Sequence, residues 1–302
     1  MQLRRLGRTD LTVSSIGLGC VTFGREIDLA TSLSVMDHAH ARGITLFDTA
    51  EAYGAGRSES VVGEWIKSRG ARDQIVLASK VGGPLNAQRI IESAEASLRR
   101  LQTDRLDLFQ LHVWDAGTPL EETLDALSTL VASGKVRYVG ASNWTAAQLS
   151  QALDDARERG TPRLASIQPP YNLVEREIEA ELLPFCGKEG IGVITYSPLG
   201  AGFLTGKYGA GTQVPPGTRF DIIPDHQPIY FTPHGFRVLE NLQRLAAEVD
   251  RPMAQVALSW VLRQPHVTSV LIGARNTAQV DQALTAEQAK LPDDLVQRLR
   301  HE

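Results

Sequence analysis

Short apolar, β-branched segments alternate with longer segments of helical spacing along most of the chain. The first seven apolar segments start about thirty residues apart, and each holds four to six residues. Near-continuous apolar runs of this length suit parallel strands that are buried on both faces. The predicted strands cover residues 15–19, 44–47, 75–79, 106–111, 136–140, 164–168, 191–196 and 269–272.

The segments between these strands have the apolar spacing of amphipathic helices, and several end at a glycine. Gly160 and Gly190, for example, fall just past the helical spacing, where a left-handed cap is often needed. The predicted helices cover residues 29–42, 88–101, 120–132, 146–159, 177–188, 236–249 and 253–264, and another begins near residue 277.

Strand–helix units repeated in series form either a doubly wound sheet or a closed (β/α)8 barrel. Eight strands without a break in composition favour the TIM barrel, with residues 1–302 as one domain. A doubly wound dinucleotide-binding sheet would carry GxGxxG after its first strand, but GLGCVTFG has its third glycine in the wrong place. Residues 2–16 predict a short β-hairpin that covers the bottom of the barrel.

The spacing changes once, in a long loop after the seventh strand. About seventy residues separate the seventh and eighth strands, and residues 198–235 are rich in proline and glycine. A loop of this length in a compact fold is usually functional, so we expect a lid.

Composition narrows the class of protein. The chain has 302 residues, of which 42% are hydrophobic and 22% charged, so it is globular rather than disordered. Its net charge of −4 comes from interleaved charges without a basic stripe, which speaks against nucleic-acid binding. Two cysteines imply no disulfide framework. With no signal-peptide core and no apolar run of roughly 18 residues, we expect a soluble cytoplasmic protein, monomeric or a modest homo-oligomer, without a membrane partner.

Four side chains with acid–base chemistry follow consecutive predicted strands. Asp48 and Tyr53 lie in FDTAEAYG, Lys80 ends IVLASK, and His112 follows LDLFQL. The functional groups of a barrel gather at the carboxyl ends of its strands, so we expect these side chains to meet. A carboxylate, a phenol, an ammonium and an imidazole together could protonate a carbonyl oxygen.

The chemistry calls for a tyrosine whose pKa lies well below its free value of about 10. An ammonium about 4 Å away favours the phenolate by roughly 4 kcal/mol at an effective dielectric near 20, or about three pKa units. Taken singly, the four residues suit a helix cap, loop packing, a solvated charge and a core imidazole. Their common register on consecutive strands favours catalysis.

These motifs resemble those of the aldo-keto reductases in order and spacing as well as in residue type, along nearly the whole chain. The resemblance implies a (β/α)8 barrel and reversible NADPH-dependent reduction of an aldehyde or ketone to an alcohol. It implies Tyr53 as general acid and base, Lys80 and Asp48 as its tuning pair, and His112 as the group that orients the carbonyl. Two alternatives stay open, an NADPH-sensing auxiliary subunit like the potassium-channel β subunits and a barrel aldolase with a Schiff base on Lys80.

The resemblance also implies nicotinamide contacts at the ends of the fifth to seventh strands. The candidates are Ser142, Asn143, Gln168 and Tyr196, whose amides and hydroxyls could bind a carboxamide and whose aromatic ring could stack. Asn143 has an alternative interpretation as a helix cap. The seven histidines are scattered without metal-ligand spacing, so we expect no metal site.

Residues 197–208, SPLGAGFLTGKY, resemble the family's loop across the cofactor pyrophosphate, where small residues admit backbone N–H groups to the phosphates. The candidates in this loop are Ser197, Leu199, Gly202 and Lys207. After the last strand, Gly273 and Arg275 precede a helix whose N-terminus favours phosphate. Arg275 could pair with a 2′-phosphate, which favours NADPH over NADH. Gln279 matches a common adenosine-contacting position.

The chain departs from the family pattern at a few positions. Gln282 and Ala283 stand where Glu and Asn are common, and Cys20 replaces a frequent Thr. The substrate pocket would be lined from the loops after the strands, and its candidate residues are Val21, Trp114 and Phe220. An apolar, aromatic rim suits an aldehyde or ketone with a hydrophobic body, but the sequence does not name the substrate.

Overall fold

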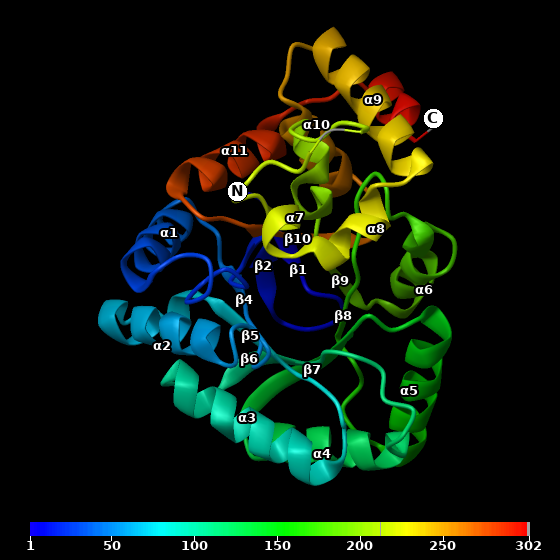
Figure 1. Cartoon of the computed structure of the whole chain (residues 1–302). Coiled ribbons are helices and arrows are strands. Elements are labelled where there is room, and N and C mark those ends of the chain that lie inside the picture. Colours follow the sequence, from blue (N-terminus) through cyan, green and yellow to red (C-terminus); the bar gives the residue numbers. More distant parts are fainter. Residues whose placement is uncertain (212, 301–302) are drawn as a thin grey trace.

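A computed structural model describes residues 1–211 and 213–300 of the chain. Its barrel strands are β3 Ile16–Gly19, β4 Leu46–Asp48, β5 Val76–Val81, β6 Leu106–Leu111, β7 Val136–Ser142, β8 Ser166–Gln168, β9 Gly192–Thr195 and β10 Val267–Gly273. These eight strands of the described chain are parallel and close into a ring in the order β10-β3-β4-β5-β6-β7-β8-β9. Helices surround the ring (Figure 1). The predicted (β/α)8 barrel is confirmed.

The surrounding helices cover the strands from outside, which explains why the strands are apolar on both faces. They are α1 Leu29–Ala41, α2 Arg57–Arg69, α3 Ala87–Leu101, α4 Leu120–Ala132, α5 Ala146–Arg159, α6 Leu182–Glu189, α9 Pro233–Glu248, α10 Met253–Leu262, α11 Thr277–Gln288 and α12 Asp293–Arg298. The caps predicted at Gly160 and Gly190 are confirmed, since both residues adopt the left-handed conformation, with φ of 66° and 64°.

The helix predicted over residues 177–188 is wrong in one respect. A short 3-10 helix, η2 Glu177–Glu179, precedes α6, and Glu181 between them has a non-helical φ of −130°. The helix α2 was not among the predicted helices, although its apolar positions face the core.

An N-terminal hairpin covers one end of the barrel. β1 Leu3–Arg5 pairs antiparallel with β2 Thr12–Ser14. Leu6, Leu11 and Val13 of this hairpin share a buried cluster with inward side chains of the barrel strands, such as Leu46 and Leu108. The predicted hairpin at the barrel bottom is therefore confirmed, and it leaves the opposite end, where the strands terminate, for the functional residues.

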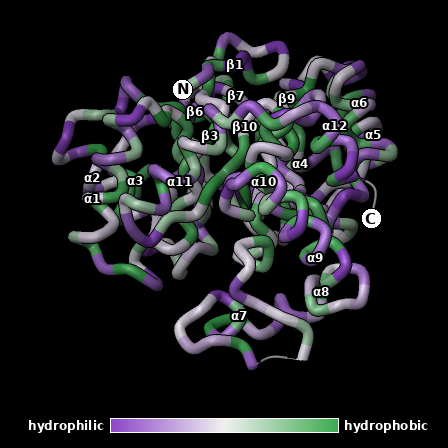
Figure 2. Tube along the Cα trace, turned by 90° about the horizontal axis from the view of Figure 1, so that it is seen from above, coloured by the Kyte–Doolittle hydropathy of each residue, from purple (hydrophilic) through white to green (hydrophobic). Residues whose placement is uncertain are grey.

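The long loop after β9 builds a projecting segment at that opposite end. It contains η3 Gly200–Thr205, α7 Arg219–Ile222, η4 Pro224–His226 and α8 Gln227–Tyr230. Figure 2 shows α7 and β1 at opposite ends of the molecule. We call residues 213–231 the lid; Thr212 lies outside the described residues. Its rings, including Phe220 and Phe231 with centroids 5.1 Å apart, form an aromatic cluster with Phe203 and Tyr208.

Across residues 1–211 and 213–300, no helix has the length and apolar character needed to span a membrane.

Candidate active site

Three adjacent strands bring the four acid–base residues together. Asp48 is the last residue of β4, and Lys80 lies near the end of β5, where its register partner on β6 is Gln110. His112 follows β6 directly, and its backbone N–H donates to the carbonyl of the residue after Lys80 at 2.8 Å. Tyr53 lies in the turn after β4. The sequence-predicted quartet therefore meets at the carboxyl end of the barrel.

The Lys80 side chain is fully buried and donates three hydrogen bonds. They run to Oδ1 of Asp48 at 2.5 Å, to the backbone carbonyl of Thr49 at 2.9 Å and to the hydroxyl of Tyr53 at 3.2 Å. Burial on its own lowers the pKa of Lys80, but the charge of Asp48 and the contact with Tyr53 outweigh burial and raise that pKa. Lys80 is therefore a charged ammonium with each of its protons engaged.

The pKa of Tyr53 is shifted in the opposite direction from the one predicted. Its ring lies 4.8 Å from the Lys80 ammonium and 5.9 Å from the His112 ring, edge to face. Burial raises the pKa of the Tyr53 phenol, and Lys80 offsets only part of this effect. The predicted pKa well below 10 is wrong for this structure, because desolvation of the phenolate outweighs its attraction to the ammonium. At neutral pH the residue carries its proton.

His112 has the opposite shift. Burial lowers its pKa to about 4, and the positive charge of Lys80 adds to this effect. The imidazole is therefore neutral near pH 7 and can donate an N–H, which suits the predicted role of His112 as the group that orients a carbonyl.

Two side-chain amides hold the second oxygen of Asp48. Gln168 on β8 donates to Oδ2 at 2.9 Å, and Gln110 on β6 donates to it at 3.3 Å. Gln110 was missed by sequence reasoning. The available signal was a polar side chain in the run LDLFQL two residues after Leu108, where the alternation of a strand puts both side chains on the same face.

The predicted nicotinamide contacts form one connected rim beside these residues. Ser142 donates its hydroxyl to the carbonyl of Gln168 at 2.8 Å. Asn143 donates its amide to the carbonyl of His112 at 3.0 Å and accepts from the hydroxyl of Tyr196 at 2.9 Å. The structure thus places all four candidates next to the acid–base residues.

The alternative interpretation of Asn143 as a helix cap is wrong. The N-cap of α5 is Thr145, whose hydroxyl accepts from the backbone of Gln148 at 3.2 Å within a capping box. Asn143 instead has a left-handed φ of 61°, and its side chain joins the residues that follow β6 and β9.

The residues proposed for the pyrophosphate lie on a tightly turned backbone. Ser197 has a φ of 54°, and Leu199 packs partly buried against the core. Gly202 has a φ of 92°, and a Cβ there would lie 3.1 Å from the Lys207 ammonium. Burial and the charge of Arg275 lower the pKa of Lys207. Lys207 and Arg275, which are distant in sequence, are therefore close enough in space to interact electrostatically.

The turn before α11 has free space at Gly273 and a hydrogen-bonded backbone at Arg275. A Cβ at Gly273 would meet no atom within 4 Å. The N-cap of α11 is Asn276, and the side chain of Gln279 accepts from the backbone N–H of Arg275 at 2.8 Å. Arg275 donates from Nη1 to the carbonyl of Gly217 in the lid at 3.0 Å. Of the residues predicted to bind the cofactor at this turn, Arg275 therefore contacts the lid.

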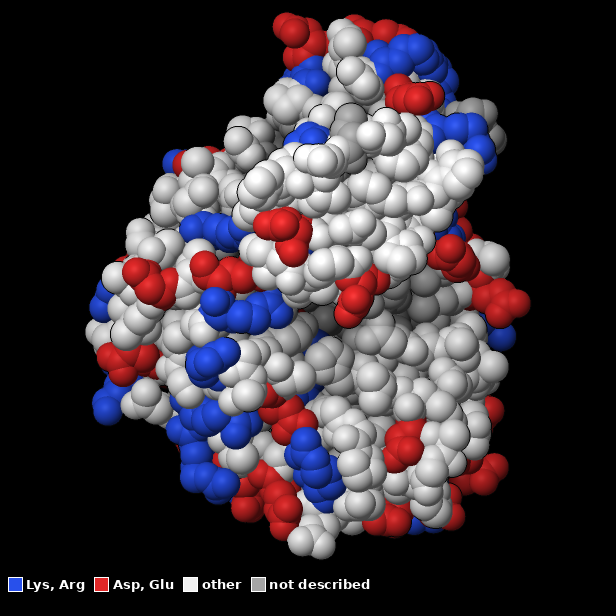
Figure 3. Space-filling model, in the orientation of Figure 1, with Lys and Arg blue, Asp and Glu red and all other residues white. Residues whose placement is uncertain are grey.

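The candidate substrate residues differ in their accessibility. Val21 is half-buried, and Trp114 is half-buried with its ring 4.6 Å from that of Trp144. Phe220 is fully buried, and its ring packs edge to face on Tyr208. Because it belongs to the lid's own aromatic cluster, we leave Phe220 out of the proposed substrate pocket. Figure 3 shows the largely uncharged outer surface of the lid, with a hollow beside it.

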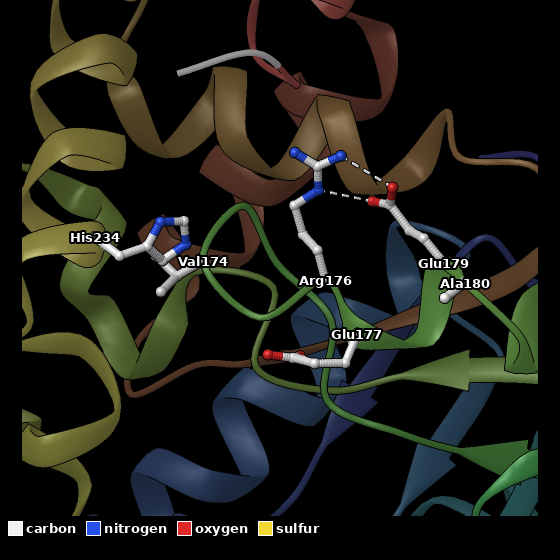
Figure 4. Close-up of a pocket in the computed structure, with 6 residues that line it drawn as sticks. All are labelled: Val174, Arg176, Glu177, Glu179, Ala180 and His234. Atoms are coloured by element: carbon white, nitrogen blue, oxygen red, sulfur yellow. Dashed lines mark hydrogen bonds and ion pairs between the residues drawn. The ribbon is translucent and has the colours of Figure 1, made fainter.

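Two hollows lie outside the acid–base quartet. One, of about 490 Å³, is lined by Val174, Arg176, Glu177, Glu179, Ala180 and His234 (Figure 4). There Arg176 makes paired 2.9 Å bonds with Glu179, so that its charge is neutralised. A second hollow, of about 360 Å³, lies between α1 and the start of α11, beside the turn that carries Arg275. No cluster of three or more metal-ligating side chains occurs within the described part of the chain.

Comparison with known proteins agrees with this architecture. The chain belongs to the aldo/keto reductase family, whose model matches residues 15–301. It is 37% identical to the uncharacterized oxidoreductase YrpG of Bacillus subtilis, an alignment that covers 99% of this chain and 95% of that protein. It is 35% identical to protein tas of Escherichia coli, over 98% and 96% of the two chains. It is 34% identical to a probable voltage-gated potassium channel subunit beta of Arabidopsis thaliana, over 95% and 91%. The family is one of oxidoreductases that generally use a nicotinamide cofactor.

Proposed function

We propose that this protein reduces an aldehyde or ketone to an alcohol with NADPH, reversibly, and that Tyr53 is the general acid. The observation that carries the proposal is the 3.2 Å hydrogen bond between the Tyr53 hydroxyl and the buried, charged Lys80. It places a proton donor next to a cation that can stabilise the phenolate left after proton transfer.

Each residue of the quartet has a separate role. Tyr53 enters the reduction protonated, because burial raises its pKa, and gives its proton to the carbonyl oxygen. The Lys80 ammonium stabilises the Tyr53 phenolate that remains after proton transfer. Asp48 keeps Lys80 charged and holds its side chain in one orientation. His112, neutral at physiological pH, donates an N–H to the carbonyl oxygen and so positions it near Tyr53. Nicotinamide, when bound, would supply the hydride.

The chemistry of the surrounding residues fits such a cofactor. The left-handed turn at Gly202, with a φ of 92° that disfavours any side chain, leaves the backbone open close to the Lys207 ammonium. In the turn before α11, the open space at Gly273 adjoins Arg275 and the N-terminus of the helix, whose backbone dipole favours phosphate. Cationic groups near two turns without bulky side chains are suited to a dinucleotide with an additional phosphate.

The aldolase alternative is disfavoured by the state of Lys80. A Schiff-base lysine attacks as a neutral amine, which requires a lowered pKa and a free lone pair. Here the pKa of Lys80 is raised and its three protons are donated to Asp48, Thr49 and Tyr53.

A second candidate function is a cofactor-sensing auxiliary subunit, favoured by the similarity to probable potassium channel subunits beta. The two functions differ in turnover, because a sensor binds cofactor tightly and converts carbonyls slowly or not at all.

The experiment is a panel of aldehydes and ketones assayed by NADPH absorbance with the parent protein and with Tyr53→Phe. We expect Tyr53→Phe to lower kcat/KM by at least about 10³-fold, at the upper end of general acid catalysis, while NADPH still binds. Near-normal turnover in this variant would refute the assigned acid. Tight NADPH binding without turnover of any carbonyl by the parent protein would favour the sensor.

A further inference from the structure

Glu26, in the loop between β3 and α1, is the centre of a cluster of arginines that no sequence motif indicated. Its side chain is 5% exposed. Oε1 accepts from Nη1 of Arg219 in the lid at 2.5 Å and from Nη2 of Arg25 at 2.5 Å. Oε2 lies 3.0 Å from Nε of Arg275 in the turn before α11. One carboxylate thus joins three segments that are far apart in sequence.

This cluster carries more positive than negative charge. Three guanidiniums share the one carboxylate, so the four side chains together have a net charge of +2. Lys207 adds a further cation that interacts with Arg275. Burial and the neighbouring arginines lower the pKa of Arg219, although Glu26 opposes this effect. A partly buried excess of positive charge favours the binding of an anion with several charges.

The guanidinium of Arg275 already has two partners. Its Nη1 donates to the lid carbonyl of Gly217, and its Nε lies against Glu26. The same guanidinium is the proposed partner of a 2′-phosphate. A phosphate that binds there must either displace Glu26 from Arg275 or lie close to a like charge, and both reduce its affinity. A ribose 2′-hydroxyl has no such conflict, since it can donate a hydrogen bond to a carboxylate.

We propose that Glu26 is a specificity-determining residue for the cofactor, whose carboxylate competes with the 2′-phosphate for Arg275 and so weakens NADPH binding relative to NADH. The inference rests on the proposed nicotinamide cofactor. It assigns a role to a residue outside the acid–base quartet and the nicotinamide rim.

The test is the dissociation constant of NADP⁺ and of NAD⁺, measured by titration calorimetry at fixed salt concentration for the parent and for Glu26→Gln. The substitution keeps the size and polarity of the side chain and removes its charge. We expect NADP⁺ to bind about tenfold more tightly, by a difference of about 1.4 kcal/mol. NAD⁺ should change by less than about twofold. The matched control is Asp73→Asn, which removes a carboxylate paired with Arg105 just before β5, at the other end of the barrel. It should change neither constant.

An unchanged ratio of the two constants in Glu26→Gln, or an equal change for both dinucleotides, overturns the inference while leaving the proposed function intact. If the parent binds neither dinucleotide, the proposed function fails first. In an Arg275→Met background the effect of Glu26→Gln should disappear, and its persistence would contradict competition at Arg275. Should Glu26→Gln fail to fold, structures of the parent decide: Arg275 should leave Glu26 with NADP⁺ and stay with NAD⁺.

Discussion

Gln168 donates a 2.9 Å hydrogen bond to Oδ2 of Asp48, and the two residues stand four strands apart in a ring of eight, on opposite walls of the barrel. Asp48 is nearly inaccessible, so that water does not solvate its charge. Lys80 on one oxygen and two amides on the other supply the donors instead. This arrangement fixes the direction of a buried ion pair toward Tyr53 and offsets part of its desolvation.

The ion pair between Lys80 and Asp48 makes a testable contribution to stability. Lys80→Met leaves a buried carboxylate without its cation, and Asp48→Asn leaves a buried ammonium without its anion. We expect each single variant to lose about 3–5 kcal/mol of unfolding free energy, and the double variant to lose much less than the sum. Urea unfolding at pH 7 measures all three.

The control for this cycle is the exposed pair of Asp154 and Arg157, at 2.7 Å on the surface of α5. Asp154→Asn should change stability by less than about 1 kcal/mol. Additive losses in the Lys80 and Asp48 cycle would show that the two side chains are not coupled.

The two amides on Asp48 should differ in their importance. Gln110 makes the longer bond, at 3.3 Å, and its Oε1 has no hydrogen-bond partner among the described residues. Gln110→Leu therefore removes a weak bond together with an unsatisfied buried acceptor, and we expect a change within about 1 kcal/mol. Gln168→Leu removes the 2.9 Å bond and should cost about 1–3 kcal/mol. Denaturant unfolding ranks the two, and a reversed order would contradict the geometry.

His112 gives the protein a dependence of stability on pH with a defined sign. Its pKa falls from an ordinary value of 6.5 to about 4 in the folded chain, mainly through burial. Between these values the unfolded chain takes up a proton and the folded chain does not, so stability falls as the pH drops from 6.5 to 4. Above 6.5 the contribution is fully present.

The variant His112→Gln lacks this titration. From pH 7.5 to 4.5 the parent should lose about 1–2 kcal/mol more unfolding free energy than the variant, a figure reduced for partial exposure of the ring. Carboxylates titrate in both proteins and cancel in the difference. Equal losses would mean that the ring is protonated in the folded state.

Much of the fold and of the quartet could be predicted because the signals are local. A strand of apolar residues followed by Asp48, Lys80 or His112 needs no knowledge of packing, since the barrel gathers strand ends at one edge. The orientation of Gln110 and the contact of Glu26 with Arg219 depend instead on side chains 62 and 193 residues from their partners. Such contacts are set by tertiary packing, which the local pattern does not contain.

The pKa of Tyr53 could not be predicted either, because it depends on tertiary packing. The sequence indicated a cation near the phenol and therefore a lowered pKa. It gave no measure of how deeply the phenol is buried, and burial is the larger effect in the structure. The burial of Phe220 could not be predicted for a similar reason, because an aromatic residue in a proline-rich loop is equally compatible with a pocket wall and with the lid's own core.

The lid offers a matched pair of substitutions on α7. Phe220 is fully buried among the lid rings, whereas Ile222, two residues on, is 46% exposed. Phe220→Ala should loosen the lid, since removal of a buried phenyl ring costs about 3–5 kcal/mol. We expect proteolysis within residues 213–231 to accelerate by more than about tenfold, and Ile222→Ala to change it by less than about twofold. If Phe220 were a wall of the substrate pocket instead, its removal would shift KM between small and bulky carbonyls and leave the lid resistant to protease. That result would return Phe220 to the pocket and contradict its assignment to the aromatic cluster.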